Sequence, residues 1–101
     1  MNNKKAANKQ QRKNAVLSWS DMAWEDYLFW QDTDPKSVAK INDLILECLN
    51  DPFRGTGRPE PLKGDLTGFW SRRIDRQHRL VYLPSEGCIY VAACRFHYDE
   101  K

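Results

Sequence analysis

The segment GTGRPEPLKGDLTGFWSRRIDRQHRLVY, residues 55–82, constrains the fold more than any other part of the chain. It begins inside a stretch, residues 53–67, in which closely spaced glycines and prolines predict a loop. The apolar runs that follow are rich in strand-forming residues, and the breaks between them are too short for anything but antiparallel hairpins. We therefore predict three strands and two turns: strands at 68–74, 78–83 and 88–95, with turns at 75–77 and 84–87.

The residues before this segment predict a short strand and two helices. Residues 15–19 form an apolar run, and Ser20 is a good N-cap for a helix that continues to about residue 31. Asp34 followed by Pro35 predicts the start of a second helix, which must end before Pro52. The order β-α-α-β-β-β predicts an α+β fold, with a helical hairpin packed on one face of a twisted antiparallel β-sheet.

Both helices carry apolar residues at helical spacing. In the first helix, Trp24, Tyr27, Leu28 and Gln31 follow the spacing of a buried stripe. The stripe of the second helix is cleaner, and we expect it to face the core: Val38, Ile41, Leu44, Ile45, Cys48 and Leu49.

The net charge of +2 conceals a strong asymmetry along the chain. Residues 1–14 carry five cations and no acid, residues 15–51 are acidic, and residues 52–98 carry eight Arg or Lys against four acids. We expect one domain over residues 15–101, preceded by a disordered basic extension over residues 1–14, either a solubilising tail or an arm for RNA phosphates. The basic second half would attract a polyanion.

Several classes of function are disfavoured by composition. No run approaches the roughly 18 apolar residues of a membrane span, so we expect no membrane association. The three cysteines have no metal-ligand spacing and fit small buried side chains in a reducing cytoplasm. His78 and His97 are the only histidines, and no phosphate-binding glycine motif is present. We therefore predict neither a metal site nor a cofactor.

The remaining polar residues suit RNA cleavage, because RNA supplies its own nucleophile in the 2′-hydroxyl. Such a reaction needs a base, cations for the phosphate and an acid for the leaving 5′-oxygen. Glu60 could be the base and His97 the acid, with Tyr98 or Phe96 stacking on a nucleobase. We predict that phosphate is bound by the cations of the same region: Lys63, Arg72, Arg73 and Arg79. From the residues alone, a plain RNA-binding surface remains an alternative.

Five motifs resemble a known family, the YoeB (Txe/YoeB) toxins of the wider RelE/ParE superfamily. They are WSxxxWEDYLFWQ, DPFxGxGxPEPLK, LxGFWSRRI, HRLVY and AACRFHY, and together they run through residues 15–98 almost without interruption. The resemblance implies roles for individual residues. Glu60 of PEPLK would be the general base, Arg79 of HRLVY would stabilise the phosphate, and His97 and Tyr98 would supply the acid and a positioning phenol. Lys63 and Arg73 match positions that support phosphate binding.

The resemblance also implies a biological setting. It is that of a bacterial cytoplasmic toxin, a metal-independent endoribonuclease that cleaves mRNA in the ribosomal A site. A YefM-like antitoxin would inhibit it, a homodimer is expected, and operator DNA would be bound only as the toxin–antitoxin complex. Two alternatives stay open: a ParE-like inhibitor of a topoisomerase that cleaves nothing, and a regulatory nucleic-acid-binding module.

Overall fold

The structure is a computed structural model that describes residues 16–96. Its elements follow the order β1 (Val16–Trp19), α2 (Asp21–Thr33), α3 (Pro35–Asn50), β2 (Glu60–Pro61), the 3₁₀ turn η1 (Gly64–Leu66), β3 (Trp70–Arg73), β4 (Arg79–Ser85) and β5 (Cys88–Ala93). The expected extension over residues 1–14 and the two expected site residues His97 and Tyr98 lie outside the described residues.

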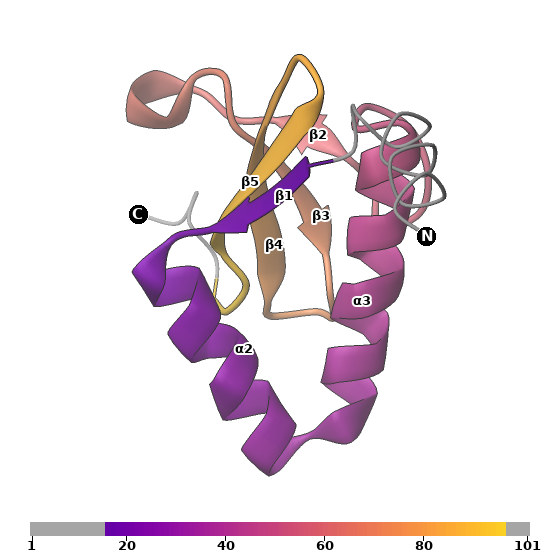
Figure 1. Cartoon of the computed structure of the whole chain (residues 1–101), viewed down its shortest axis with the longest axis vertical. Helices are drawn as coiled ribbons and strands as arrows, with labels where there is room; N and C mark the ends of the chain where they lie inside the picture. Colours follow the sequence, from indigo (N-terminus) through magenta and orange to yellow (C-terminus); the bar gives the residue numbers. More distant parts are fainter. Residues whose placement is uncertain (1–15, 97–101) are drawn as a thin grey trace, which may run out of the picture.

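The two helices begin and end where the sequence predicts. The side chain of Ser20 accepts a hydrogen bond from the backbone N–H of Ala23, which caps α2, and its hydroxyl donates to the carbonyl of Ala92 on β5. Asp34 caps α3, with Pro35 in the first turn. Figure 1 shows the helices diverging from this connection like the arms of a V. The α+β class and the helical hairpin on a sheet are therefore confirmed.

The sheet differs from the prediction in one respect, because it is mixed and not wholly antiparallel. Its strand order is β1-β5-β4-β3-β2, and β1 pairs with β5 in parallel while the other neighbours are antiparallel. The short turns dictate the direction of β3, β4 and β5. In the sequence, both helices and the other strands lie between β1 and β5, so no short turn dictates the direction of β1.

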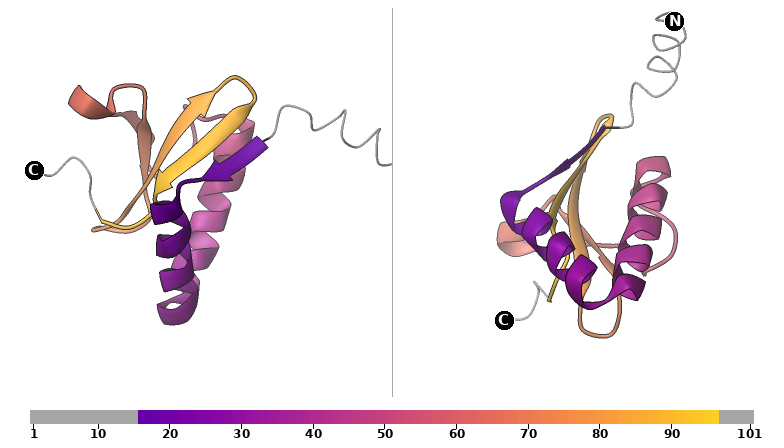
Figure 2. Two further views of the ribbon diagram at one scale, coloured as in Figure 1. Left: turned by 60° about the vertical axis from the view of Figure 1, so that its left-hand side comes forward. Right: turned by 60° about the horizontal axis from the view of Figure 1, so that its bottom comes forward.

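The segment predicted as a loop also contains regular structure. Strand β2, Glu60–Pro61, pairs with Ser71 and Trp70, and η1 follows it. Proline is tolerated here because β2 lies at the edge of the sheet, where one side of the strand has no partner. Figure 2 shows η1 and α3 on opposite sides of the sheet in both views.

The core lies between the helices and one face of the sheet. The predicted stripe of α3 is confirmed, since Ile41, Leu44, Ile45 and Cys48 are buried against Leu80, Tyr82, Ile89 and Val91 of the sheet. The stripe predicted for α2 is wrong. Helix α2 instead buries Ala23, Asp26 and Trp30, while Trp24 and Leu28 are exposed. Which face of a helix is buried depends on the elements that pack against it. The spacing of the aromatic residues in α2 is compatible with more than one buried face.

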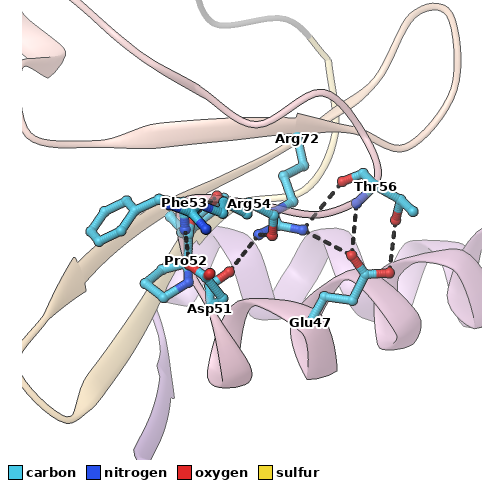
Figure 3. Close-up of polar contacts among 8 residues, drawn as sticks. Glu47, Asp51, Pro52, Phe53, Arg54, Thr56 and Arg72 are labelled. Carbon is cyan, nitrogen blue, oxygen red and sulfur yellow. Dashed lines mark hydrogen bonds and ion pairs between the residues drawn. The ribbon is translucent and has the colours of Figure 1, made fainter.

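Arg72 of β3 joins the sheet to α3 and to the loop that follows it (Figure 3). Its side chain is fully buried, and its guanidinium forms an ion pair of 3.1 Å with Glu47. The same group donates to the Tyr82 hydroxyl and to three loop carbonyls, those of Asp51, Arg54 and Thr56. A guanidinium has five N–H groups, and these contacts occupy all five.

The loop is shaped closely around this guanidinium. Thr56 donates to Glu47 through both its backbone N–H and its hydroxyl, each at 2.8 Å. Gly55 has a φ of +130°, and a Cβ at this position would collide with the carboxylate of Glu47 and the guanidinium of Arg72. A glycine is therefore required where the loop passes over the ion pair.

We expect Arg72→Lys to lower the free energy of unfolding by about 2–4 kcal/mol, because an ammonium has three donors and would leave acceptors around the buried cation unpaired. Urea denaturation measures the loss. Arg73→Lys is the matched control: Arg73 is the next residue on β3, is exposed, and should change stability by less than about 0.5 kcal/mol. Equal effects of the two substitutions would contradict the assigned role.

Stability should also depend on pH through Glu47. Its pKa is lowered first by the two hydrogen bonds from Thr56 and then by Arg72. A carboxyl whose pKa is lower in the folded than in the unfolded state stabilises the fold above its unfolded pKa, and this stabilisation is lost as the pH falls through the folded pKa. We expect Glu47→Gln to be less stable than wild type at pH 7, with the difference shrinking as the pH falls below about 4.3, the ordinary pKa of Glu, and disappearing below the lowered pKa of the folded state. A difference that stays constant across this range would contradict it.

Candidate functional site

The candidate site lies on the face of the sheet that turns away from the helices. Side chains alternate along a strand, so Trp70 and Arg72 face the helices while Ser71 and Arg73 face the other side. Glu60 pairs with Ser71 across the β2–β3 ladder, and Arg73 pairs with Arg79 across the β3–β4 ladder. Directly paired residues share a face, so the register places Glu60, Arg73 and Arg79 together on it.

The spacing on this face suits one bound phosphodiester. Glu60 and Arg73 are diagonal neighbours, with backbones about 7–8 Å apart, and Arg79 lies one strand further on. Glu60 and Arg73 are exposed, and Arg79 is half-buried. Within residues 16–96, the Glu47–Arg72 ion pair is the only one, so the carboxylate of Glu60 and the guanidinium of Arg73 are not engaged in salt bridges there.

Arg79 is the most constrained of these cations. Its Nη1 donates to the carbonyls of Asp75 and His78 at 3.1 and 3.2 Å, in the turn that connects β3 to β4. The turn is itself held by the carboxylate of Asp75, which accepts from the N–H groups of Gln77 and His78. These contacts use only part of the guanidinium, so Arg79 still has donors that could face a ligand.

Lys63 lies at the start of η1, in the loop between β2 and β3, and it is exposed. This loop lies on the same side of the sheet as the candidate site (Figure 2). Its ends are joined by a hydrogen bond from the N–H of Leu62 to the carbonyl of Phe69. Lys63 is therefore placed on a loop anchored at both ends beside Glu60, and its role in phosphate binding stays a prediction.

Arg72 does not belong to the site, and its assignment to phosphate binding is wrong. Its side chain is fully buried on the opposite face, and all five of its donors are occupied. The sequence motif SRRI shows two adjacent arginines, and sequence alone cannot tell which of them faces the core. The alternation of β3 assigns Arg72 to the core and Arg73 to the surface.

Phe96, at the C-terminal end of the described residues, lies beside the candidate site. The carbonyl of Phe96 accepts from the backbone N–H of Arg79, which brings the end of the described chain beside the start of β4. Phe96 is 50% exposed, and its stacking on a nucleobase stays a prediction. His97 and Tyr98 follow directly in sequence.

Sequence reasoning missed the residues that hold this returning segment. Asp26 and Trp30 of α2 are buried and bond to the backbone of Cys94, and His78 bonds to the backbone of Phe96. Burial raises the pKa of Asp26, and it also raises the pKa of the Cys94 thiol to about 12. The Cys94 thiol is therefore a poor nucleophile, which agrees with its treatment as an apolar core residue. In the sequence, the one signal of these supports was an acid, Asp26, among the aromatic residues of a helix.

A second feature is an apolar groove of about 380 Å³ on the helical side of the molecule. Its lining comes from β1, α2 and α3: Leu17, Trp19, Trp24, Tyr27, Asn42, Ile45, Leu46 and Leu49. The rings of Trp19, Trp24 and Tyr27 contact one another with centroids 5.0–5.5 Å apart. Trp24 and Leu46 are 45% and 65% exposed, which is typical of a surface that another protein covers.

Of the helices in residues 16–96, none has the length and apolar character needed to cross a membrane.

Known proteins match this chain over most of its length. The family model described as "YoeB-like toxin of bacterial type II toxin-antitoxin system" matches residues 19–98. The chain is 55% identical to toxin YoeB of Escherichia coli (strain K12) over 82 residues, which are 81% of this chain and 98% of the relative.

Solved structures agree with the sequence match. The YoeB dimer from Staphylococcus aureus has a TM-score of 0.79 and 42% identity, over 84% of this chain and 99% of that one. YoeB in the heterotetrameric YoeB–YefM toxin–antitoxin complex from Staphylococcus aureus has a TM-score of 0.76 and 43% identity, over 81% of this chain and 95% of that one. The fold and the match over residues 19–98 agree: this chain belongs to the YoeB family of bacterial type II toxin–antitoxin toxins.

Proposed function

We propose that the protein is a ribosome-dependent mRNA endoribonuclease that works without a metal ion. The observation that carries the proposal is the register of β2, β3 and β4, which gathers an exposed carboxylate and two guanidinium groups on one face. Family membership makes RNA the expected substrate, and the 2′-hydroxyl of RNA is a nucleophile that a positioned carboxylate can activate. The ribosomal A site would hold the message in the conformation that this reaction needs.

The chemistry assigns each residue one task. Glu60 removes the proton of the 2′-hydroxyl, whose oxygen attacks the adjacent phosphorus. Arg73, Arg79 and Lys63 bind the phosphate oxygens and stabilise the charge that builds up on them in the transition state. The bond to the 5′-oxygen then breaks, and His97 donates a proton to that oxygen while Tyr98 positions the phosphate. The products are a 5′-hydroxyl end and a 2′,3′-cyclic phosphate, which water can open to a 3′-phosphate.

Phe96 completes the site in this proposal. Its exposed ring lies at the end of the described chain, beside the start of β4, where a base next to the cleaved bond could stack on it.

The partners follow from family membership and from the apolar groove. A YefM-like antitoxin would inhibit the toxin in the bacterial cytoplasm, and operator DNA would be bound only by the complex of the two. The chain would also form a homodimer through the groove between β1, α2 and α3, where Trp24 and Leu46 are exposed. This groove is on the helical side of the sheet, so a dimer formed there leaves the catalytic face open.

Primer extension on an mRNA translated in vitro tests the activity. We expect wild-type protein to produce cuts in phase with the codons, and we expect Glu60→Gln to abolish them because an amide cannot take the proton. Glu86→Gln is the control, since Glu86 is an exposed acid in the β4–β5 turn. A message left intact by wild-type protein would contradict the proposal and direct attention to topoisomerase inhibition. Cuts that persist in Glu60→Gln would remove Glu60 from the chemistry.

Light scattering coupled to size-exclusion chromatography tests the dimer. We expect Trp24→Glu to be a monomer, because a dimer would bury the new carboxylate without a partner. Phe53→Glu introduces the same charge at another exposed ring and should leave the dimer intact. A Trp24→Glu variant that remains dimeric would show that this groove is not the interface.

A further inference from the structure

Three parts of the chain meet at the segment Cys94–Phe96. Helix α2 holds both polar groups of the Cys94 backbone: Asp26 accepts from its N–H at 3.0 Å, and the indole N–H of Trp30 donates to its carbonyl at 2.8 Å. Asp26 and Trp30 are four residues apart and therefore neighbours on one face of the helix. They fix the point at which β5 ends.

The turn between β3 and β4 holds the next part of the segment. The N–H of Phe96 donates to Nδ1 of His78 at 2.7 Å, and the N–H of Arg79 donates to the carbonyl of Phe96 at 3.2 Å. The imidazole also lies against the rings of Trp30 and Phe96, with centroids 4.8 and 5.4 Å apart. Because Nδ1 accepts a backbone N–H, it cannot carry a proton itself, so the neutral ring is protonated at Nε2.

The backbone of Phe96 needs this support. Its φ is +67°, in the left-handed region, which a bulky residue rarely occupies. Such a conformation persists only where the surroundings determine it, and here one hydrogen bond on each side of Phe96 does so. The φ and ψ of Phe96 set the direction in which the chain continues to His97.

We propose that His78 is a positioning residue that holds the backbone of Phe96 beside Arg79, and so fixes the point and direction from which the chain continues to His97. This inference rests on the proposed function, in which His97 protonates the leaving oxygen. His78 itself would touch neither the RNA nor the reacting atoms. Its contribution is made through a single hydrogen bond, and loss of that bond misplaces the acid. Displacement of a catalytic group by about 1 Å can slow a reaction by roughly 10²-fold.

Two substitutions of His78 separate positioning from packing. His78→Phe keeps a ring against Trp30 and Phe96 but removes the acceptor. His78→Asn loses the ring but places an amide oxygen where Nδ1 was, so it can still accept from Phe96. Gln77→Phe is the control for an added ring, because Gln77 is the exposed neighbour in the same turn.

We expect His78→Phe to lower kcat for cleavage of ribosome-bound mRNA by roughly 10- to 100-fold, with KM and ribosome co-sedimentation unchanged. His78→Asn should recover most of the loss, and Gln77→Phe should cleave like wild type. Wild-type rates in His78→Phe would overturn the proposal. So would a failure of His78→Asn to recover any activity, or a loss in His78→Phe that is matched by a fall in melting temperature and in ribosome binding.

A second readout does not depend on activity. In a ¹⁵N NMR spectrum of wild-type protein, we expect His78 to show the Nε2–H form and the amide of Phe96 to exchange slowly with solvent. In His78→Phe that amide should exchange at least 10-fold faster, and in His78→Asn it should stay protected. If wild-type protein cleaves no RNA, the proposed function fails, and these spectra alone decide whether His78 directs the segment. Equal exchange in all variants would overturn the positioning role.

Discussion

The guanidinium of Arg72 is the interaction on which the rest of this structure depends. Its five hydrogen bonds join β3, Tyr82 of β4, Glu47 of α3 and the loop after α3. Without it, three loop carbonyls would lose their donors, and the buried hydroxyl of Tyr82 would lose a partner. The same loop leads into β2, so the position of Glu60 depends on a cation that never reaches the surface.

Arg72 and Arg73 show how the alternation of side chains along a strand separates a residue that stabilises the fold from its neighbour at the candidate site. They are chemically identical neighbours on one strand, yet one is buried among carbonyls while the other is exposed on the opposite face, which carries the candidate site. The burial of Arg72 is tolerated because each of its donors has an acceptor and Glu47 balances its charge. Arg73 has no such set of acceptors in residues 16–96, which is why we assign it to a ligand.

Local signals in the sequence predicted the elements well, and long-range pairings only in part. The caps at Ser20 and Asp34, the stripe of α3 and the hairpins of β3, β4 and β5 depend on neighbouring residues, so their pattern can be read directly. The parallel pairing of β1 with β5 and the pairing of β2 with β3 join distant segments, and no local rule specifies them. The same limit applies to the site: motifs identified Glu60, Arg73 and Arg79, but only the register separated Arg73 from Arg72. The supports Asp26, Trp30 and His78 could not be found before the fold was known.

The face that carries the candidate site is not arranged for stability. Arg73 and Arg79 are directly paired across β3 and β4, and like charges in that position repel each other. A sheet selected only to fold would place an acid opposite one of them, yet the one ion pair in residues 16–96 lies on the other face. Here the backbone carbonyls of Asp75 and His78 hold Arg79 in place without neutralising it. In the function we propose, a bound phosphate would relieve this repulsion, and the charge conflict that the free protein retains would contribute to the affinity for RNA.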